Sequence, residues 1–334
     1  MNKIKIGIIT NGKFVDKYTY DLAKWLKSNS KYFHFKNFIS IPNEKTNFDN
    51  NKILKKIFFK LIVFFENVIL KFTNKHKNHL SKFDIKNVVR EELKIKILKR
   101  NEFNKKDLKD IKNKKFDILI RSCANILDKD FFKISKYGII SFHHGDYKHF
   151  RGSPAGFWEV FNKERKTGFM IQKINEGLDY GNIILEGFVQ TKSFFLLNQA
   201  ELYLKSNFYL KKFLLDFSKN KKFIFIKKGK KGKIYETPKI YNQIKYILQT
   251  NKILIKKLFF NKYNFKLALF KENNIAYPIV VKNDKNKFLA DPFLIKHNNE
   301  TYCFAEEYDN IKKRGHIVCI NFKKEVPEKK NCFK

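Results

Sequence analysis

The chain has 334 residues, of which 43% are hydrophobic and 16% aromatic, enough apolar material for the core of one large domain or two ordinary ones. This composition excludes an intrinsically disordered protein, although 31% of the residues are charged. The formal net charge is +39 at pH 7. Nucleic-acid-binding proteins usually concentrate Lys and Arg on one stripe, whereas here lysine is spread along nearly the whole chain. We interpret most of the charge as compositional, with an anionic partner (membrane surface, nucleotide phosphate or RNA) as the alternative.

The four cysteines are scattered along the sequence. Cys123, Cys303, Cys319 and Cys332 form no C-x-x-C pair and have no metal-ligand spacing. This predicts a reduced, cytoplasmic compartment and no metal site. The N-terminus leads directly into the apolar run 4–9, which is typical of a strand and not of a signal peptide.

Residues 53–72 form a long apolar segment that is interrupted by charges, among them Lys60, Glu66 and Lys71. Its longest unbroken apolar run covers 61–65, too short for a membrane-spanning helix of about 20 apolar residues. The lysines recur at helical spacing, which predicts a helix with a narrow polar stripe. Two interpretations stay open: a mostly buried helix, or an amphipathic helix in peripheral contact with a membrane surface.

Apolar runs alternate with helical patterns through residues 1–190. This alternation predicts a Rossmann-like α/β fold with a largely parallel sheet and helices on both faces. Residues 36–83 are expected to form an insertion. In such sheets ligands bind beyond the carboxyl ends of the strands, which is where His143 and His144 fall. Strands are expected at 3–10, 94–98, 116–120 and 138–142, and helices at 18–26 and 104–112.

The remaining sequence predicts two further regions. Residues 191–270 are expected to form a basic helical connector, with helices at 198–218 and 243–260. Residues 275–322 contain four short apolar runs separated by polar turns, which predicts a small C-terminal all-β unit.

The residues best suited to chemistry lie between positions 138 and 182. His143 follows a buried strand, so its ring projects at a strand end, where an acid–base group is useful. Asp179 lies between two glycines in an expected turn. A histidine and a carboxylate from separate loops are a candidate proton-transfer pair, although most such pairs in a sequence never meet.

Four motifs of this block resemble those of the formyltransferase family, which includes methionyl-tRNA, glycinamide-ribonucleotide and amino-sugar formyltransferases. They are Ser141-Phe-His143, Arg151-Gly152, Thr167-Gly168 and Asp179-Tyr-Gly181. Their order and spacing make the resemblance specific, and it extends more loosely from the first strand to about Glu186. The resemblance implies that residues 1–190 form a catalytic domain.

The resemblance also implies the reaction, which is the transfer of a formyl group from 10-formyltetrahydrofolate to a primary amine. His143 and Asp179 would be catalytic, together with Ser141, which stands where the family has Asn. Loss of one oxyanion donor costs about 2.7–4 kcal/mol, or 10²–10³ in rate. The acceptor would be contacted by His144, Arg151 and Gly152, and the folate by Ser122, Cys123, Ala124, Ile126, Leu127 and Ile140.

Residues 291–317 resemble the opening blade of five-bladed propellers found in furanosidase-like glycoside hydrolases. The motifs are Asp291-Pro-Phe, Tyr302-Cys-Phe-Ala-Glu-Glu and Gly315-His-Ile. A propeller needs about four blades to close, and the chain supplies roughly one. This glycan setting favours an amino sugar or sugar nucleotide as acceptor. Methionyl-tRNA is the first alternative, and a catalytically degenerate fold acting as a binding module is the second.

Overall fold

The computed structural model describes residues 2–42, 50–73, 75–99, 102–127, 129–174, 182–226, 232–259, 265–271, 274–322 and 328–332. The chain divides into two units, Met1–Asn251 and Lys252–Lys334.

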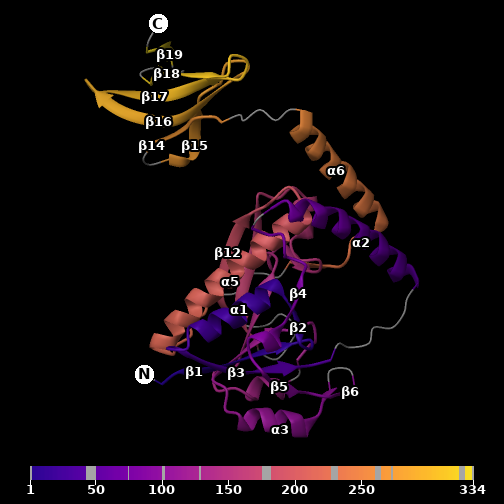
Figure 1. The fold of residues 1–334 in the computed structure, drawn as a ribbon. Helices are drawn as coiled ribbons and strands as arrows, with labels where there is room; N and C mark the ends of the chain where they lie inside the picture. The colour runs from indigo at the N-terminus through magenta and orange to yellow at the C-terminus, as the bar shows by residue number, and fades with distance from the viewer. Residues whose placement is uncertain are drawn as a thin grey trace. The chain divides into compact units, whose positions relative to one another are not determined.

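A mixed sheet of seven strands forms the centre of the first unit, in the order β12-β11-β9-β8-β1-β3-β5 (Figure 1). Four of the neighbouring pairs are parallel, while β11 is antiparallel to both β9 and β12. The predicted Rossmann-like, largely parallel sheet is therefore confirmed. The strands are β1 (Ile4–Thr10), β3 (Phe33–Ser40), β5 (Glu91–Lys94), β8 (Ile118–Ser122), β9 (Ile139–His144), β11 (Lys166–Lys173) and β12 (Asn182–Gln190).

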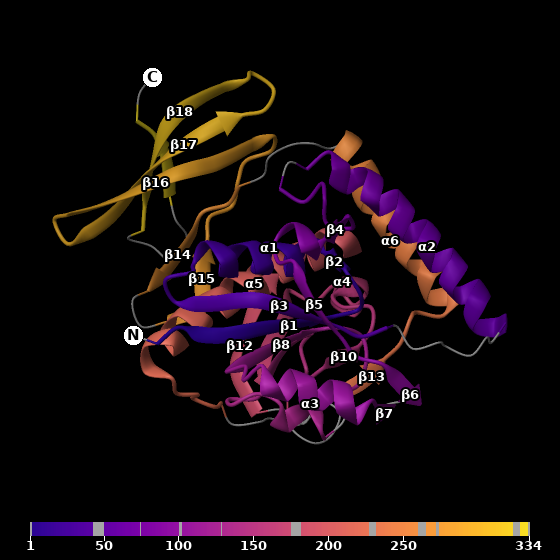
Figure 2. The ribbon, with the colours of Figure 1, turned by 60° about the horizontal axis from the view of Figure 1, so that its bottom comes forward.

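Helices cover both faces of this sheet (Figure 2). Strand β1 is buried on both sides, as the parallel sheets of α/β proteins usually are. On one face, Ile8 packs in a cluster with Leu22 of α1 (Lys17–Ser28) and Leu214 of α5 (Phe195–Asn220). On the other face, Ile9 packs in a cluster with Leu108 of α3 (Lys105–Asn113). The sheet thus separates two apolar cores.

Strand β3 corrects the predicted insertion at 36–83. It lies between β1 and β5 in the central sheet, and Phe38 and Ile39 are fully buried. The polar Lys36 and Asn37 interrupt the apolar pattern and hide this strand in the sequence. Asn37 is buried because its Nδ2 donates to Glu91 Oε2 at 2.7 Å, which satisfies the amide inside the sheet.

The helix predicted at 53–72 is present as α2 (Asn50–Lys71). One side of it is buried, where Ile62 and Leu70 pack in a cluster with Phe157 of α4 (Phe157–Phe161) and Phe195 of α5. Phe59 adds ring contacts to the same two phenylalanines. The opposite side of α2 is exposed. The interpretation as a mostly buried helix is therefore wrong, because only one face finds apolar partners in the first unit.

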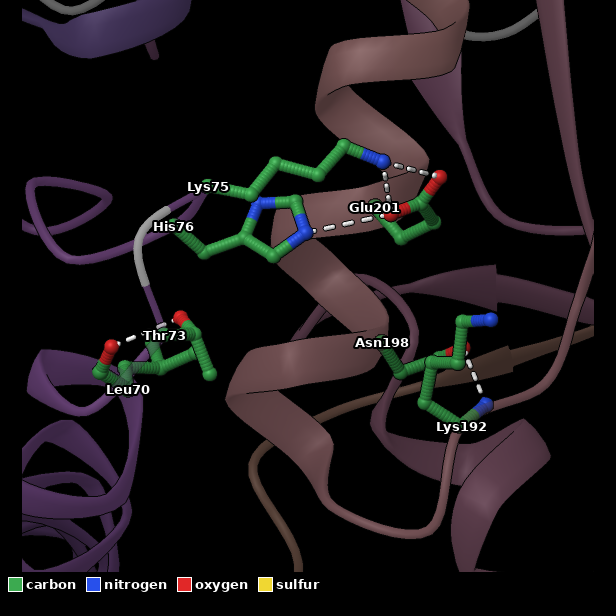
Figure 3. A network of polar contacts seen from close by, with 7 residues as sticks. All are labelled: Leu70, Thr73, Lys75, His76, Lys192, Asn198 and Glu201. Carbon is green, nitrogen blue, oxygen red and sulfur yellow. Dashed lines mark hydrogen bonds and ion pairs between the residues drawn. The ribbon is translucent and has the colours of Figure 1, made fainter.

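Polar contacts fix the end of α2 to the first unit (Figure 3). Thr73 Oγ1 donates to Leu70 O at 2.7 Å and closes the last turn of the helix. The next segment is tied to α5, because Lys75 Nζ and His76 Nε2 lie 2.9 Å and 3.1 Å from Glu201 Oε2. The helix is thus held in a defined position on the body of the unit.

The predicted connector at 191–270 is corrected in its first half. Helix α5 packs on the sheet, and its Leu202, Leu210 and Leu214 are fully buried. Helix α6 (Ile240–Phe259) follows and contains the boundary between the two units. Shorter elements of the first unit are β2 (Phe14–Asp16), β4 (Lys82–Asp84), η1 (Ile85–Asn87), β6 (Ile97–Lys99), β7 (Glu102–Phe103), η2 (Phe131–Lys133), β10 (Phe150–Gly152) and β13 (Lys233–Tyr235).

The second unit is all-β beyond the end of α6, as predicted for residues 275–322. The strands β14 (Ala268–Lys271) and β15 (Asn274–Val280) form a hairpin. A four-stranded antiparallel sheet follows, in the order β16 (Lys287–His297), β17 (Glu300–Asp309), β18 (Arg314–Asn321) and β19 (Glu328–Asn331). Within the described residues, β16 does not pair with β19, so this sheet is open. Its likeness to a propeller blade stays a prediction.

Candidate active site

A cavity of about 580 Å³ opens at the carboxyl ends of β1 and β8. The chain order of the sheet reverses between these two strands, and open α/β sheets bind their ligands at such a point. The volume lies within the range of small-molecule sites. The lining residues are Asn11, Phe14, Val15, Asp16, Tyr18, Lys82, Arg121, Ser122, Cys123, Ala124, Ser141, Phe142 and His144.

Strand geometry places three polar side chains on one face at this edge. Alternate residues of a strand share a face. The side chains of Ser141 and His143 therefore lie on the same face of the sheet as Ile139, which belongs to the core on the α3 side. By the same rule, Arg121 of β8 lies on the same face as Leu119, which belongs to that core. Arg121 and Ser141 are also register partners in the parallel pair. His143 lies inside β9 and not after it, which corrects the expected strand end at residue 142.

The guanidinium group of Arg121 points toward Ser141 and braces the following loop. Its Nη1 lies 3.5 Å from Ser141 Oγ. Its Nε and Nη2 donate to Asn125 O at 3.1 Å and 2.7 Å, and Nη2 also donates to Ala124 O at 3.4 Å. Sequence reasoning missed this residue. A charged residue directly after the apolar run 116–120 was the signal that could have revealed it.

The end of β8 and the loop after it are fixed by side chains from α1 and from the residue that follows β1. Asn11 Oδ1 accepts from the amide of Ala124 at 2.6 Å. Ser122 Oγ lies 3.2 Å from Tyr18 Oη and also bonds Thr19 Oγ1. Burial raises the pKa of the Cys123 thiol, so this side chain is a neutral wall of the cavity and not a nucleophile.

The structure brings three of the six predicted folate contacts to the cavity, namely Ser122, Cys123 and Ala124. The other three do not line it. Leu127 and Ile140 are buried in the two apolar cores, and Ile126 is exposed. The predicted folate contacts of these three stay predictions. Leu127 and Ile140 serve packing, which a sequence pattern does not separate from ligand contact.

His144 faces the side of the sheet opposite to Ser141 and His143. Its ring stacks on Phe142 with centroids 5.2 Å apart, and its Nε2 lies 2.9 Å from Ser206 Oγ. Burial lowers the pKa of His144 to about 3. The ring is thus neutral, and the predicted contact of His144 with the acceptor stays a prediction. It lines the cavity as an uncharged aromatic wall.

Arg151 and Gly152 lie in β10, which pairs with β13. Arg151 Nη1 donates to Gly232 O at 3.4 Å. Gly152 has φ +97°, and a Cβ there would lie 2.0 Å from Tyr235 O, so the close strand pairing itself requires glycine. Neither residue lines the cavity, and their predicted contact with the acceptor stays a prediction. Asp179, with the motif Asp179-Tyr-Gly181, lies outside the described residues, and its pairing with His143 stays a prediction.

Glu159 of α4 supports the loop that follows His143. Its side chain is buried, and its Oε1 accepts from the backbone amide of Asp146 at 3.4 Å. Burial raises the pKa of Glu159 to about 7. The folded protein therefore binds the proton of this group more tightly than the unfolded chain does.

We expect this carboxyl group to make the fold less stable as the pH rises from about 4.5 to 7. Since one pKa unit corresponds to about 1.4 kcal/mol, the loss is about 3 kcal/mol. Urea unfolding at several pH values measures it. The Glu159→Gln variant should lack this part of the pH dependence, whereas Asp216→Asn, a change at an exposed carboxylate of α5, should keep it. Identical pH profiles for wild type and Glu159→Gln would contradict the assignment.

Comparison with known sequences finds a family for the central part of the chain. Residues 53–193 match the profile of the family described as "Formyl transferase". This segment belongs to the formyltransferase family. It includes β8, β9 and the residues Arg121, Ser141 and His143, whereas β1 and α1 lie before it.

The curated relatives of the formyltransferase segment match over short stretches. The methionyl-tRNA formyltransferase of Anaeromyxobacter dehalogenans (strain 2CP-C) is 33% identical over 69 residues, which cover 21% of this chain and 22% of that protein. The enzyme of the same name from Thermodesulfovibrio yellowstonii is 36% identical over 89 residues, 27% of this chain and 28% of its own. The chain therefore matches about a quarter of the length of these relatives.

Among solved structures, a sugar N-formyltransferase from Shewanella sp FDAARGOS_354 aligns with a TM-score of 0.45 at 14% identity. The alignment covers 74% of this chain and 87% of that one.

Proposed function

We propose that the chain transfers a formyl group from 10-formyltetrahydrofolate to a primary amine. The observation that carries this proposal is that Arg121, Ser141 and His143 share one face at the carboxyl ends of β8 and β9, where Arg121 and Ser141 line the cavity. These residues lie in the segment that matches the formyltransferase family. Strong polar groups at the carboxyl ends of β8 and β9 are suited to acyl transfer, in which negative charge develops on one oxygen.

In this reaction the amine nitrogen forms a bond to the formyl carbon, and the bond from that carbon to the folate nitrogen breaks. The carbonyl oxygen carries negative charge between the two events. The guanidinium group of Arg121 is placed to donate a hydrogen bond to such an oxygen. The hydroxyl of Ser141 donates to Phe142 O at 3.1 Å in this structure and would have to turn to donate to the oxyanion. The proton that leaves the amine passes to the departing folate nitrogen, and the imidazole of His143 is the group on this face that can carry it.

The cavity fits the formyl donor in size and character. Its 580 Å³ can hold a heteroaromatic ring, and its wall combines the half-buried Phe142 with polar groups. The loop containing Ser122, Cys123 and Ala124 contributes backbone atoms held in place by Asn11 and Arg121. A donor bound against this loop would present its formyl group toward Ser141.

For the acceptor we favour an amino sugar or a sugar nucleotide. The open sheet β16–β19 supports this choice, because it agrees better with a blade of a glycan-associated propeller than with a closed barrel. The names of the curated relatives support methionyl-tRNA as the second candidate. A folate-binding module without catalysis is the third.

An isotope-labelled formyl-transfer assay separates the three candidates. The purified chain is incubated with labelled 10-formyltetrahydrofolate and, in turn, a panel of nucleotide-linked amino sugars and methionyl-tRNA. We expect label in a sugar product. Label in methionyl-tRNA alone would show that methionyl-tRNA, and not an amino sugar, is the acceptor. Folate binding measured by calorimetry, without label in any product, would favour the binding module without catalysis. Absence of folate binding would contradict the proposed function.

A further inference from the structure

The outward side of α2 carries a continuous row of exposed apolar side chains. Leu54, Ile57, Leu61, Phe64, Phe65 and Val68 follow one another at helical spacing. The exposed fraction of Phe65 is 65% and that of Leu54 is 64%. Single exposed apolar residues are common, but a contiguous row of this length marks an interaction surface.

The exposed charged side chains beside this row are all positive. Helical geometry places Lys56, Lys60 and Lys71 along one border of it, and all three are exposed. The sequence of α2 contains one acidic residue, Glu66. Its carboxylate is buried, where it accepts from the amide of Leu196 at 2.6 Å. The exposed surface of the helix is therefore apolar and cationic.

The part of α6 that belongs to the first unit extends the same surface chemistry beside α2 (Figure 2). The two helices touch where Gln243 Nε2 donates to Lys55 O at 2.9 Å and where the hydroxyl of Tyr246 bonds Glu66. Ile244 is exposed as well. The sequence of α6 contains lysines and no acidic residue. Both helices thus present apolar side chains next to positive charge.

We propose that α2 lies on an anionic lipid surface, with its apolar row inserted at the boundary between headgroups and acyl chains. Helices that lie in a membrane interface combine Phe and Leu on one side with Lys on the flanks, and anionic lipids attract the lysines. Across the described ranges, none of the helices has the length and apolarity needed to cross a membrane. Contact along the surface is what this pattern of residues permits.

Two other occupants fit the surface less well. A second copy of the chain would place the same surface against itself, which would bring the lysine rows together without acidic side chains of α2 to neutralise them. A protein partner would need a matching acidic and apolar groove. The anchoring of α2 by Glu201 at its end favours a rigid platform that presents the row outward.

Vesicle co-sedimentation tests the proposal, and its outcome does not depend on formyl transfer. The full chain is mixed with vesicles of phosphatidylcholine, alone or with an equal part of phosphatidylserine. We expect binding to the mixed vesicles at least about tenfold stronger than to the neutral ones, and weaker in high salt. The double variant Phe64→Ser/Phe65→Ser should lose about tenfold in affinity, and so should Lys56→Gln/Lys60→Gln/Lys71→Gln.

Phe208→Ser is the matched control, because Phe208 of α5 is 58% exposed and lies outside the row. It should bind vesicles as the wild type does, and thermal unfolding should show that all variants are folded. Equal binding to both vesicle types, no binding at all, or undiminished binding of Phe64→Ser/Phe65→Ser would overturn the proposal. A dimer in sedimentation velocity that this variant abolishes, together with no vesicle binding, would assign the surface to a second copy instead.

Discussion

Replacing His143 with alanine should lower the rate of formyl transfer by about 10²–10⁴, the usual contribution of a general acid–base group. The affinity for the folate donor should hardly change, because His143 is not among the residues that line the cavity. Steady-state kinetics with labelled donor measures the first effect, and calorimetry with a folate analogue measures the second.

His34→Ala is the matched control for this prediction. His34 lies in β3 opposite Lys5 of β1, at the amino end of the parallel strands, whereas the cavity is at their carboxyl end. Its ring is half-buried, so the substitution tests the general cost of removing such a ring from the sheet. A His143→Ala variant with the wild-type rate would show that His143 does not carry the proton. Folate binding without turnover in the wild type would indicate a binding module and not an enzyme.

Much of the fold could be predicted from local patterns. β1 and α5 have clear apolar patterns, and their ends lie within three residues of the expected bounds. Strand β3 was hidden because Asn37 looks exposed in the sequence and is buried through its contact with Glu91. The packing of α5 on the sheet could not be predicted, since a basic surface and a buried face occur on the same helix.

The site was predicted less completely than the fold. A motif gives the position of His143 in the chain, but not which face of β9 its side chain shares with Ser141. The same limit explains His144, which follows in sequence and packs on the opposite side. Arg121 was missed because its place beside Ser141 depends on the register between β8 and β9. The sequence of one strand alone does not show its register with a neighbouring strand.

The contact between Arg121 and Ser141 suggests why serine is tolerated where the resembling family has asparagine. An asparagine side chain is larger than serine and would occupy space near the guanidinium group, which lies 3.5 Å from Ser141 Oγ. In this chain the arginine can supply the hydrogen bond to the oxyanion that the amide would otherwise give. The charged donor is also the stronger one, since hydrogen bonds from ionised groups are about twice as strong as neutral ones.

Arg121→Gln should therefore lower the rate constant of formyl transfer by about 10²–10³, with a smaller effect on KM, because the donor acts on charge that develops in the transition state. Ser141→Asn alone should also slow the enzyme, since the longer side chain crowds Arg121. In the Arg121→Gln background, Ser141→Asn should instead raise the rate. Without the guanidinium group there is room for the asparagine side chain, and its amide can replace the missing hydrogen bond to the oxyanion. This reversal of sign in a double-mutant cycle distinguishes a shared oxyanion role from loss of the loop contacts that Arg121 makes to Asn125. Effects that simply add, with both variants folded as judged by thermal unfolding, would show that Arg121 braces the loop and takes no part in the reaction.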